Sequence, residues 1–375
     1  MSPGLVKAMP DWDVDKRDIG PIGNLELPTM SRLLALLRCG SCRFAAFYFL
    51  SFYVAILDSG HGGWGWLLFS ALIWLLHSLG TELVNRVSDE TEDRINRPER
   101  TAMCDLIGYP RLRLLSWIIW SVVAAIDLIW VISKPNPVVG VLLALAFMSG
   151  VNYSYGARFK ERRYLSLLAL TFPFAGPFLV GWFVYHPILE SPDSLHILVG
   201  RVVPFVTIMG LLIGSIASAK DITDIRGDEM VGYLSVAVSL IRKNAVLVIL
   251  GMVSIPFLAI GLSVSSGLLP FRFSWLLFFM PVSLLGALCI NAATGEMELM
   301  AVKEAVYHYW FVLLAVSLYL YLPAGSTLLV IFGTAVYWFI GSQYLHWTDG
   351  IRIWKIRLLF TILRRVRLQP VSIGS

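Results

Sequence analysis

Residues 64–93 read WGWLLFSALIWLLHSLGTELVNRVSDETED, an apolar run that ends in a cluster of amide and carboxylate side chains. The apolar part is long enough for a helix that crosses a bilayer. Asn85, Asp89 and Asp93 follow at a spacing of four residues, so they share one face of a continuing helix. Carboxylates stacked in this way repel each other, and more strongly near hydrocarbon. We therefore expect a bound cation to offset their charge.

The composition of the chain places the rest of the sequence in the same environment. Of its 375 residues, 57% are hydrophobic and only 15% are charged, and the mean hydropathy is +0.72. A soluble domain carries about 25% charged residues. The sequence thus predicts an all-α, polytopic membrane protein, and it excludes an ordinary soluble enzyme.

Apolar segments of helical length recur along the chain. They cover residues 43–58, 64–87, 112–133, 137–153, 164–185, 196–219, 244–265, 271–292, 305–322 and 326–343. If the last two form one helix the count falls by one, so we predict nine to ten transmembrane helices. This membrane domain, residues 43–343, follows an N-terminal arm over residues 1–42. It precedes a basic amphipathic tail over residues 344–375.

Basic residues lie almost entirely on alternate loops. Of the 30 Lys and Arg, only Lys134, Arg201 and Arg272 fall near the opposite side of the predicted membrane. This asymmetry follows the positive-inside rule, so we expect both termini and the charged loops in the cytoplasm. The formal net charge of +5 then indicates contact with anionic head groups of the lipid bilayer and not with nucleic acid. The arm has four acids near its start and no apolar core, so we expect no cleaved secretory signal.

A second acidic cluster and a basic loop lie on the same predicted side. The cluster, KDITDIRGD, contains Asp221, Asp224 and Asp228. Two clusters of oxygen ligands suit Mg²⁺, which binds a few carboxylates together with phosphate oxygens and water. The basic loop NYSYGARFKERR carries Arg158 and Lys160, whose charges would neutralise a phosphorylated leaving group. The combination predicts a diphosphate site at the membrane surface, with an isoprenoid tail that reaches into the bundle.

These motifs, in this order, resemble those of the UbiA superfamily of intramembrane prenyltransferases. The first family motif, N-x3-D-x3-D followed by N-[RK]-P, is matched by residues 85–93 and 96–98. The second motif, D-x3-D, is matched by residues 224–228, and the Tyr-Ser…Arg-x-Lys loop between them by residues 153–160. The resemblance covers about residues 40–300.

The resemblance implies a helical bundle around a central cavity. It also implies a Mg²⁺-dependent reaction in which an allylic prenyl diphosphate ionises and the prenyl group passes to a lipophilic or aromatic acceptor. The implied metal ligands are Asn85, Asp89, Asp93, Asp221, Asp224 and Asp228. The implied diphosphate ligands are Arg97, Arg158, Lys160 and Lys220. Tyr153 would lie near the reacting carbon, and the implied catalytic residues are then Tyr153, Asn85, Asp89, Asp93, Asp224 and Asp228.

Two departures from the family pattern leave the acceptor open. Arg86 follows Asn85 where many prenyltransferases of the family have Asp or Gln, and Arg100 is followed by Thr101 where a proline is common. The segment ETEDRINRPER is more similar to the membrane-bound terpene cyclases of the superfamily, which capture the carbocation within the prenyl chain and need no acceptor. A multipass transporter is a third alternative. A transporter, however, places its charges at mid-bilayer on discontinuous helices, whereas these acids lie at the membrane edge.

Other polar features favour structural interpretations. The acidic clusters and the basic loop would be ordinary loop charge if the motifs did not occur in order. His77 lies within an apolar segment, and we interpret it as a hydrogen-bonded polar group rather than a base. Asp127 and Arg201 lie in or beside apolar segments and receive no role. Cys39 and Cys42 form a C-x-x-C motif without two further ligands nearby, so we expect neither a zinc site nor a redox motif.

Overall fold

The computed structural model describes residues 32–133, 136–186, 192–220, 230, 232, 242–348 and 350–368. All regular elements in these ranges are helices. They are α1 (Arg32–Cys39), η2 (Cys42–Phe44), α2 (Ala45–Asp58), α3 (Trp64–Ser88), α4 (Glu90–Asn96), α5 (Pro98–Ile107), α6 (Tyr109–Ser133), α7 (Pro137–Asn152), η3 (Phe159–Glu161), α8 (Arg163–Phe183), α9 (Pro192–Ile197), η4 (Leu198–Val202), α10 (Val203–Lys220), α12 (Arg242–Ser265), η7 (Phe271–Phe279), α13 (Met280–Ala292), α14 (Glu296–Tyr321), α15 (Gly325–Tyr344) and α16 (Ile353–Leu368). The predicted all-α class is confirmed.

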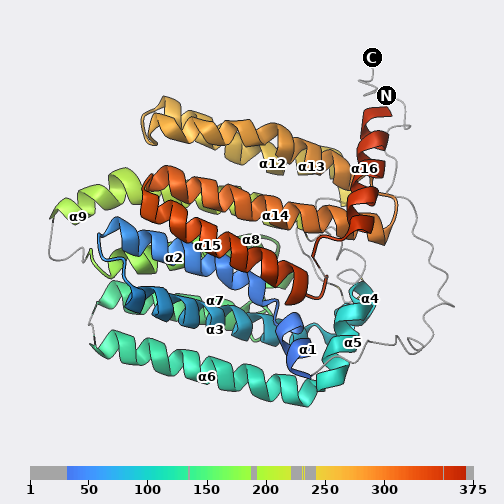
Figure 1. Ribbon diagram of the computed structural model, residues 1–375, viewed down its shortest axis with the longest axis horizontal. Coiled ribbons are helices and arrows are strands. Elements are labelled where there is room, and N and C mark those ends of the chain that lie inside the picture. The colour runs from blue at the N-terminus through green and yellow to red at the C-terminus, as the bar shows by residue number, and fades with distance from the viewer. Residues whose placement is uncertain are drawn as a thin grey trace.

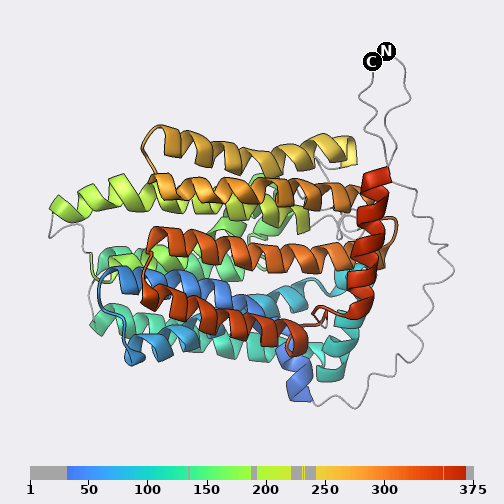
Figure 2. The same ribbon diagram turned by 45° about the horizontal axis from the view of Figure 1, so that its top comes forward.

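The long helices lie side by side, and the short ones gather at the ends of the bundle (Figure 1). Helices α1, α4 and α5 occupy one end, and α9 lies at the other. Helix α16 runs across the first end, at a steep angle to the long helices in both views (Figure 2). The first motif of the sequence, which spans α3 and α4, is therefore at the end of the bundle that α16 covers.

Six helices in the described ranges are long and apolar enough to cross a membrane. They are Trp64–Ser88, Tyr109–Ser133, Asp193–Gly214, Phe271–Ile290, Met297–Tyr321 and Gly325–Tyr344. A seventh is added if α1 and the η2–α2 helix, which are bent by 49° to each other, form one span. Three apolar helices are shorter: Pro137–Asn152, Phe174–Phe183 and Val253–Ser265. The multi-pass helical class is confirmed, whereas the predicted count of nine to ten spans is not.

A proline separates the last two long helices. Leu322, which precedes Pro323, has φ −127° and ψ 85°, and a following proline favours such an extended conformation. Helices α14 and α15 are thus separate, in agreement with the prediction of two segments, residues 305–322 and 326–343. Helix α14 begins before the predicted residue 305, because its early charges are paired. Glu298 forms a 2.7 Å ion pair with Arg365 of α16.

Helix α14 packs at the centre of an aromatic core. It contacts α2, α10, η7, α13, α15 and α16, and 56% of its span is buried, against 28% for α15. Phe311 of α14 stacks on Trp338 of α15 with the ring centroids 5.3 Å apart. Phe47 of α2 meets the same indole edge-on at 4.9 Å. Aromatic pairs of these geometries stabilise packing beyond the area they bury.

The close approach of α2 and α8 depends on a glycine. A Cβ atom at Gly181 of α8 would lie 2.5 Å from the backbone carbonyl oxygen of Phe52 and 3.1 Å from the Ala55 Cβ. Only glycine leaves room for the α2 backbone at this crossing. The two helices can therefore pack backbone to backbone.

Two ionisable side chains lie close together inside the bundle. His77 Nε2 of α3 lies 3.3 Å from Asp127 Oδ2 of α6, and both side chains are buried. The structure thus places His77 beside Asp127, and the interpretation of His77 as a cavity-facing or hydrogen-bonded polar group stays a prediction. Buried ionisable groups in a membrane protein are expected to pair in this way.

At the end away from α4, four side chains form what we call the distal clamp: Asp58, Arg201, Arg272 and Tyr321. Arg201 Nη2 lies 2.8 Å from Asp58 Oδ1, and its guanidinium is 4.3 Å from the ring centroid of Tyr321. The Tyr321 hydroxyl donates to Asp58 Oδ2 at 2.9 Å. Arg272 Nη2 donates to the Tyr321 carbonyl at 3.0 Å. The distal clamp joins the ends of α2, η4, η7 and α14, which gives Arg201 a structural role.

Candidate active site

The first motif bends where α3 ends. Asp89 has φ −99° and ψ 17°, outside the helical range, and α4 starts at the next residue. The backbone hydrogen bonds continue across the bend, from Asp89 N to Asn85 O at 2.9 Å and from Asp93 N to Asp89 O at 2.8 Å. Glu90, Glu92 and Asp93 fall in the first turn of α4, where carboxylates interact favourably with the helix dipole.

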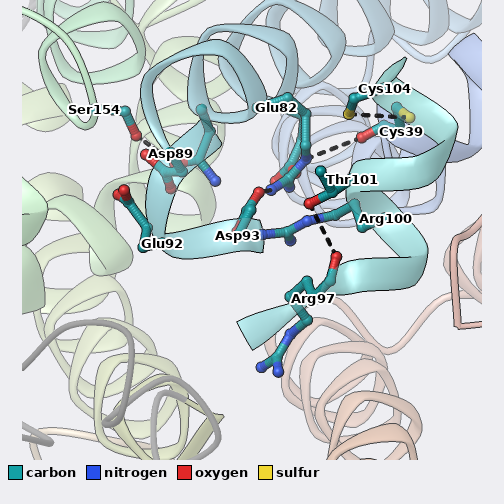
Figure 3. A network of polar contacts seen from close by, with 12 residues as sticks. Cys39, Glu82, Asp89, Glu92, Asp93, Arg97, Arg100, Thr101, Cys104 and Ser154 are labelled. Carbon is teal, nitrogen blue, oxygen red and sulfur yellow. Dashed lines mark hydrogen bonds and ion pairs between the residues drawn. The ribbon is translucent and has the colours of Figure 1, made fainter. Parts of the chain in front are cut away.

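Asn85 and Asp89 remain neighbours across the bend, as predicted. With its amide nitrogen turned toward the carboxylate, Asn85 donates to Asp89 Oδ2 at 2.7 Å. The Asn85 amide also bonds the hydroxyl of Ser154, which is buried in the turn after α7. Figure 3 shows Ser154 directed at Asp89. This contact ties the basic loop to the first motif.

Lys160 supplies the positive charge of the site. Its ammonium group contacts the Asp89 carboxylate and donates to Glu92 Oε1 at 2.9 Å. Its backbone N–H donates to the Tyr153 carbonyl at 3.1 Å, which folds the loop back on α7. The predicted proximity of the loop lysine to the acidic motif is observed.

Burial and charge act together on the acidic side chains of the site. The pKa of Asp89 is raised to about 7, because burial and the carboxylates of Asp93 and Glu92 raise it by more than the Lys160 ammonium lowers it. Burial lowers the pKa of Lys160, but the charges of Asp89 and Glu92 outweigh burial and raise it overall. Lys160 is thus held as a cation between two buried carboxylates.

Asp93 faces the other way. Its carboxylate contacts the Arg100 guanidinium of α5, and Oδ2 lies 3.6 Å from Nη1 of Arg86 in α3. Figure 3 shows Asp93 directed toward Arg100, while Asp89 and Glu92 lie on the opposite side of α4. The predicted row of Asn85, Asp89 and Asp93 is therefore divided at the bend. Asp89 contacts Lys160, and Asp93 contacts Arg86 and Arg100.

The remaining predicted diphosphate ligands have mixed surroundings. The Arg97 guanidinium is buried and lies 5.5 Å from the ring centroid of Trp347, in the turn after α15. Arg158 adopts a left-handed backbone with φ 47° and pairs with Glu161 on the half-exposed outer side of the loop. Tyr153 ends α7 and is half-buried. Lys220 ends α10, and its side chain lies outside the described residues.

The second acidic motif cannot be placed beside the first. Asp221, Asp224 and Asp228 lie outside the described residues, so their predicted roles stay predictions. Within the ranges that the structure describes, no three His, Cys, Asp or Glu side chains are arranged to hold a metal ion. The oxygen atoms of Asn85, Asp89 and Glu92 nevertheless suit a hard cation, and an ammonium ion already lies between two of them. The first motif alone therefore fits part of a magnesium site.

Sequence reasoning missed Glu92, Ser154 and the two arginines around Asp93. Glu92 is three residues from Asp89, which places both on one side of a helical turn, and this spacing was a usable signal. Arg86 was visible as a departure from the family pattern, and Arg100 stood beside a second one at Thr101. Their shared partner was not visible, because it depends on the bend.

The C-x-x-C cysteines do not face each other. Cys39 Sγ of α1 lies 3.5 Å from Cys104 Sγ of α5, and both thiols are buried. Cys42 instead donates to the Leu37 carbonyl at 3.5 Å. All four cysteines of the chain are free, and this pair joins α1 to α5 by packing.

Comparisons with known proteins agree with this architecture. Two 2-acylphloroglucinol 4-prenyltransferases of Humulus lupulus, one of them described as chloroplastic, are each 27% identical to the chain over 199 residues. The match covers 52% of this chain and 47% and 46% of theirs, so the chain spans less than half the length of these curated relatives.

Two solved structures share the fold. One is a digeranylgeranylglyceryl phosphate synthase, with a TM-score of 0.53 and 15% identity over 79% of this chain and 100% of that one. The other is a UbiA homologue from Archaeoglobus fulgidus bound to DMAPP and Mg²⁺, with a TM-score of 0.52 and 14% identity over 76% of this chain and 99% of that one. The model of the UbiA prenyltransferase family matches residues 45–299, well over half of the chain. With its multi-pass helical bundle and its ordered motifs, this chain belongs to the UbiA prenyltransferase family.

Proposed function

We propose that the chain is a Mg²⁺-dependent intramembrane prenyltransferase that acts on an allylic prenyl diphosphate and a lipophilic or aromatic acceptor. The observation that carries the proposal is the meeting of Asn85, Asp89, Glu92 and Lys160 at one end of the apolar bundle. Carboxylates that suit Mg²⁺ and a lysine that suits a phosphate are the parts that diphosphate departure requires. Membership of the family supports the same reaction class.

Each side chain has a proposed task. Asn85 and Asp89 hold one Mg²⁺, and Asp221, Asp224 and Asp228 hold the other. Bound Mg²⁺ would neutralise the charge that develops on the leaving diphosphate. Lys160 would bind the diphosphate, and the other proposed diphosphate ligands are Arg97, Arg158 and Lys220. Tyr153 lies near the reacting carbon. The C–O bond of the allylic diphosphate breaks, and the acceptor forms the new bond and loses a proton.

The wider architecture is proposed to follow the same reading of the sequence. The membrane domain, residues 43–343, has nine to ten spans around a central cavity that takes the prenyl chain from the lipid bilayer. The arm, residues 1–42, the tail, residues 344–375, and the site lie on the cytoplasmic side. Basic residues on that side contact lipid head groups, and nucleic acid is not a partner.

A terpene cyclase on the same scaffold is the second candidate. It is favoured by Arg86 and Thr101, the two departures from the prenyltransferase pattern, and the Arg86 side chain lies in the site beside Asp93. A cyclase would use the same diphosphate chemistry and no acceptor. The two candidates therefore differ in product and agree in metal dependence.

Product analysis separates the candidates. Purified protein is incubated with dimethylallyl, geranyl, farnesyl and geranylgeranyl diphosphate, each with and without a 2-acylphloroglucinol or another phenolic acceptor. We expect a prenylated acceptor and diphosphate release that require Mg²⁺ and stop on chelation. A cyclic product without acceptor would establish the cyclase instead.

Two variants test whether the measured diphosphate release depends on the site. Asp89→Asn should abolish release, whereas Asp105→Asn, which changes an exposed carboxylate of nearby α5, should leave it unchanged. Release that survives both chelation and Asp89→Asn would refute the proposed chemistry.

A further inference from the structure

The carboxylates of α4 are divided between two opposite surroundings. Glu92 and Asp89 both contact the Lys160 ammonium. Asp93 contacts Arg86 and Arg100 instead. All three carboxylates are buried, so none of them is neutralised by bulk water. The charge of each must therefore be balanced by its protein neighbours or by a ligand.

The Asp93 side of α4 already has one guanidinium group for each of its carboxylates, Asp93 and Glu82. Two guanidinium groups share one carboxylate, and neither arginine is strongly exposed, with side-chain exposures of 3% for Arg86 and 12% for Arg100. Glu82 offsets part of the Arg86 charge. A divalent cation bound to Asp93 would stand next to both arginines and would be repelled by them. The same cation at Asp89 and Glu92 would meet two carboxylates and a single ammonium group, that of Lys160.

Asp93 also occupies the junction of several helices. Arg86 belongs to α3 and Arg100 to α5, so their shared carboxylate on α4 joins three elements. Arg86 Nε also donates to the Cys39 carbonyl at the end of α1, at 3.2 Å. The Arg100 guanidinium lies 5.4 Å from the ring centroid of Trp347, in the turn after α15. These contacts fix the direction of α4 and hence the place of Glu92.

We propose that Asp93 is a positioning residue, which holds α4 through Arg86 and Arg100, and that Glu92 is the carboxylate that binds the cation together with Asp89. The proposal rests on the proposed function for the identity of the cation. It departs from the assignment that the N-x3-D-x3-D spacing implies, in which Asp93 binds metal. Arg86, a departure from the family pattern, and Arg100 are the groups that bind Asp93 instead.

The test measures metal binding and stability separately on the full chain in detergent. Mn²⁺ is the probe, and its affinity is measured by electron paramagnetic resonance without substrate. Glu92→Gln and Asp89→Asn should each weaken Mn²⁺ binding by about tenfold or more. Asp93→Asn should weaken Mn²⁺ binding less than Glu92→Gln does, and it should lower the midpoint of thermal unfolding by about 5 °C or more, because two buried guanidinium groups lose their shared carboxylate.

A double variant separates positioning from ligation. Asp93→Asn combined with Arg100→Gln removes both partners of one pair, so it should recover most of the lost unfolding midpoint. It should also recover diphosphate release relative to Asp93→Asn alone, which a lost metal ligand would not allow. If Asp93→Asn does not fold, the double variant and Glu92→Gln carry the test.

The outcomes are distinct. Mn²⁺ binding in the double variant as weak as in Glu92→Gln, or unchanged binding in Glu92→Gln, would overturn the inference and leave the proposed function standing. Wild-type protein that binds no Mn²⁺ would overturn the role of Glu92, and the product analysis would still decide the proposed function. The thermal coupling of Asp93 and Arg100 would still decide the positioning role.

Discussion

Arg43 is a fully buried charge whose partners account for its position. Its guanidinium donates from Nη1 to Glu304 Oε1 at 2.6 Å and from Nη2 to Oε2 at 3.3 Å. It also lies 4.7 Å from the ring centroid of Tyr307 and 5.0 Å from that of Trp338. A two-pronged pair surrounded by aromatic faces offsets the cost of removing both charges from water. This cluster joins the start of α2 to α14 and α15.

His346 in the same cluster predicts a pH dependence of stability. Its Nδ1 accepts from Thr348 N at 3.2 Å, which favours the neutral ring. Burial, together with the Arg43 charge, holds the pKa of His346 well below its ordinary value of 6.5. The unfolded chain takes up a proton below that value and the folded chain does not, so the folded state loses stability as the pH falls through about 6.5.

The measurement is thermal unfolding across this range. From about pH 7.5 to 5.5, the midpoint of the wild type should fall further than that of His346→Asn, whose side-chain oxygen can replace Nδ1 without titrating. His196→Asn, at an exposed position on α9, is the control and should follow the wild type. Parallel curves for the wild type and His346→Asn would contradict the assignment.

Lys160 predicts a binding defect. Lys160→Gln should raise the KM for prenyl diphosphate by about tenfold, since a charge-assisted contact to phosphate is lost. Arg162→Gln, at an exposed position on the same loop, should leave the KM near the wild-type value. Steady-state kinetics at saturating Mg²⁺ decide the matter, and an unchanged KM in Lys160→Gln would remove this residue from the substrate site.

The sequence predicted the site unevenly, for a physical reason. Asn85 and Asp89 are one helical turn apart, so their contact follows from local geometry, and the ordered motifs predicted the approach of Lys160. Arg43 and Glu304 are 261 positions apart, and no periodicity reports a pair that forms only when distant helices pack.

At the scale of helices, apolar runs located the elements well and their ends less well. All ten predicted segments correspond to helices in the described residues, because hydropathy records the part of a helix that faces lipid or core. It does not record paired charges, and for this reason the start of α14 was placed too late. Hydropathy also does not reveal where two helices cross, because close crossings depend on small residues at the point of contact.

Gly181 at the α2–α8 crossing predicts a packing defect. Gly181→Val would push side-chain atoms into the Phe52 carbonyl and should lower the free energy of unfolding by about 1–3 kcal/mol. Gly333→Ala is the matched control on α15, because a Cβ there meets nothing within 4 Å, and it should be neutral or stabilising. Denaturant titration of both variants measures the difference, and equal stabilities would refute the close contact.

On the scale of the whole molecule, the two ends of the bundle have different chemistry. The end with α4 and α5 carries the candidate active site, and the other end is closed by the distal clamp. Because the basic loops lie with the site, we expect that end to face the cytoplasm.

Thiol labelling tests this orientation. All four native cysteines are buried, so an introduced cysteine should dominate the reaction. Ser266→Cys, exposed in the turn between α12 and η7, should react with an impermeant maleimide on intact cells. Tyr155→Cys, exposed beside the site, should react only after permeabilisation. The opposite pattern, or labelling of both from one side, would contradict the proposed topology.

Trp347 lies beyond the family-matched range of residues 45–299, and yet its ring touches the guanidinium groups of Arg97 and Arg100. The turn after α15, one of the last three helices of the chain, thus helps to support the first motif. In a chimera that joined the matched range of a relative to these helices, Trp347 would pack against side chains that it does not meet in this chain. Exchange of parts between members of the family should therefore succeed only when the motif helix and the turn after α15 are moved together.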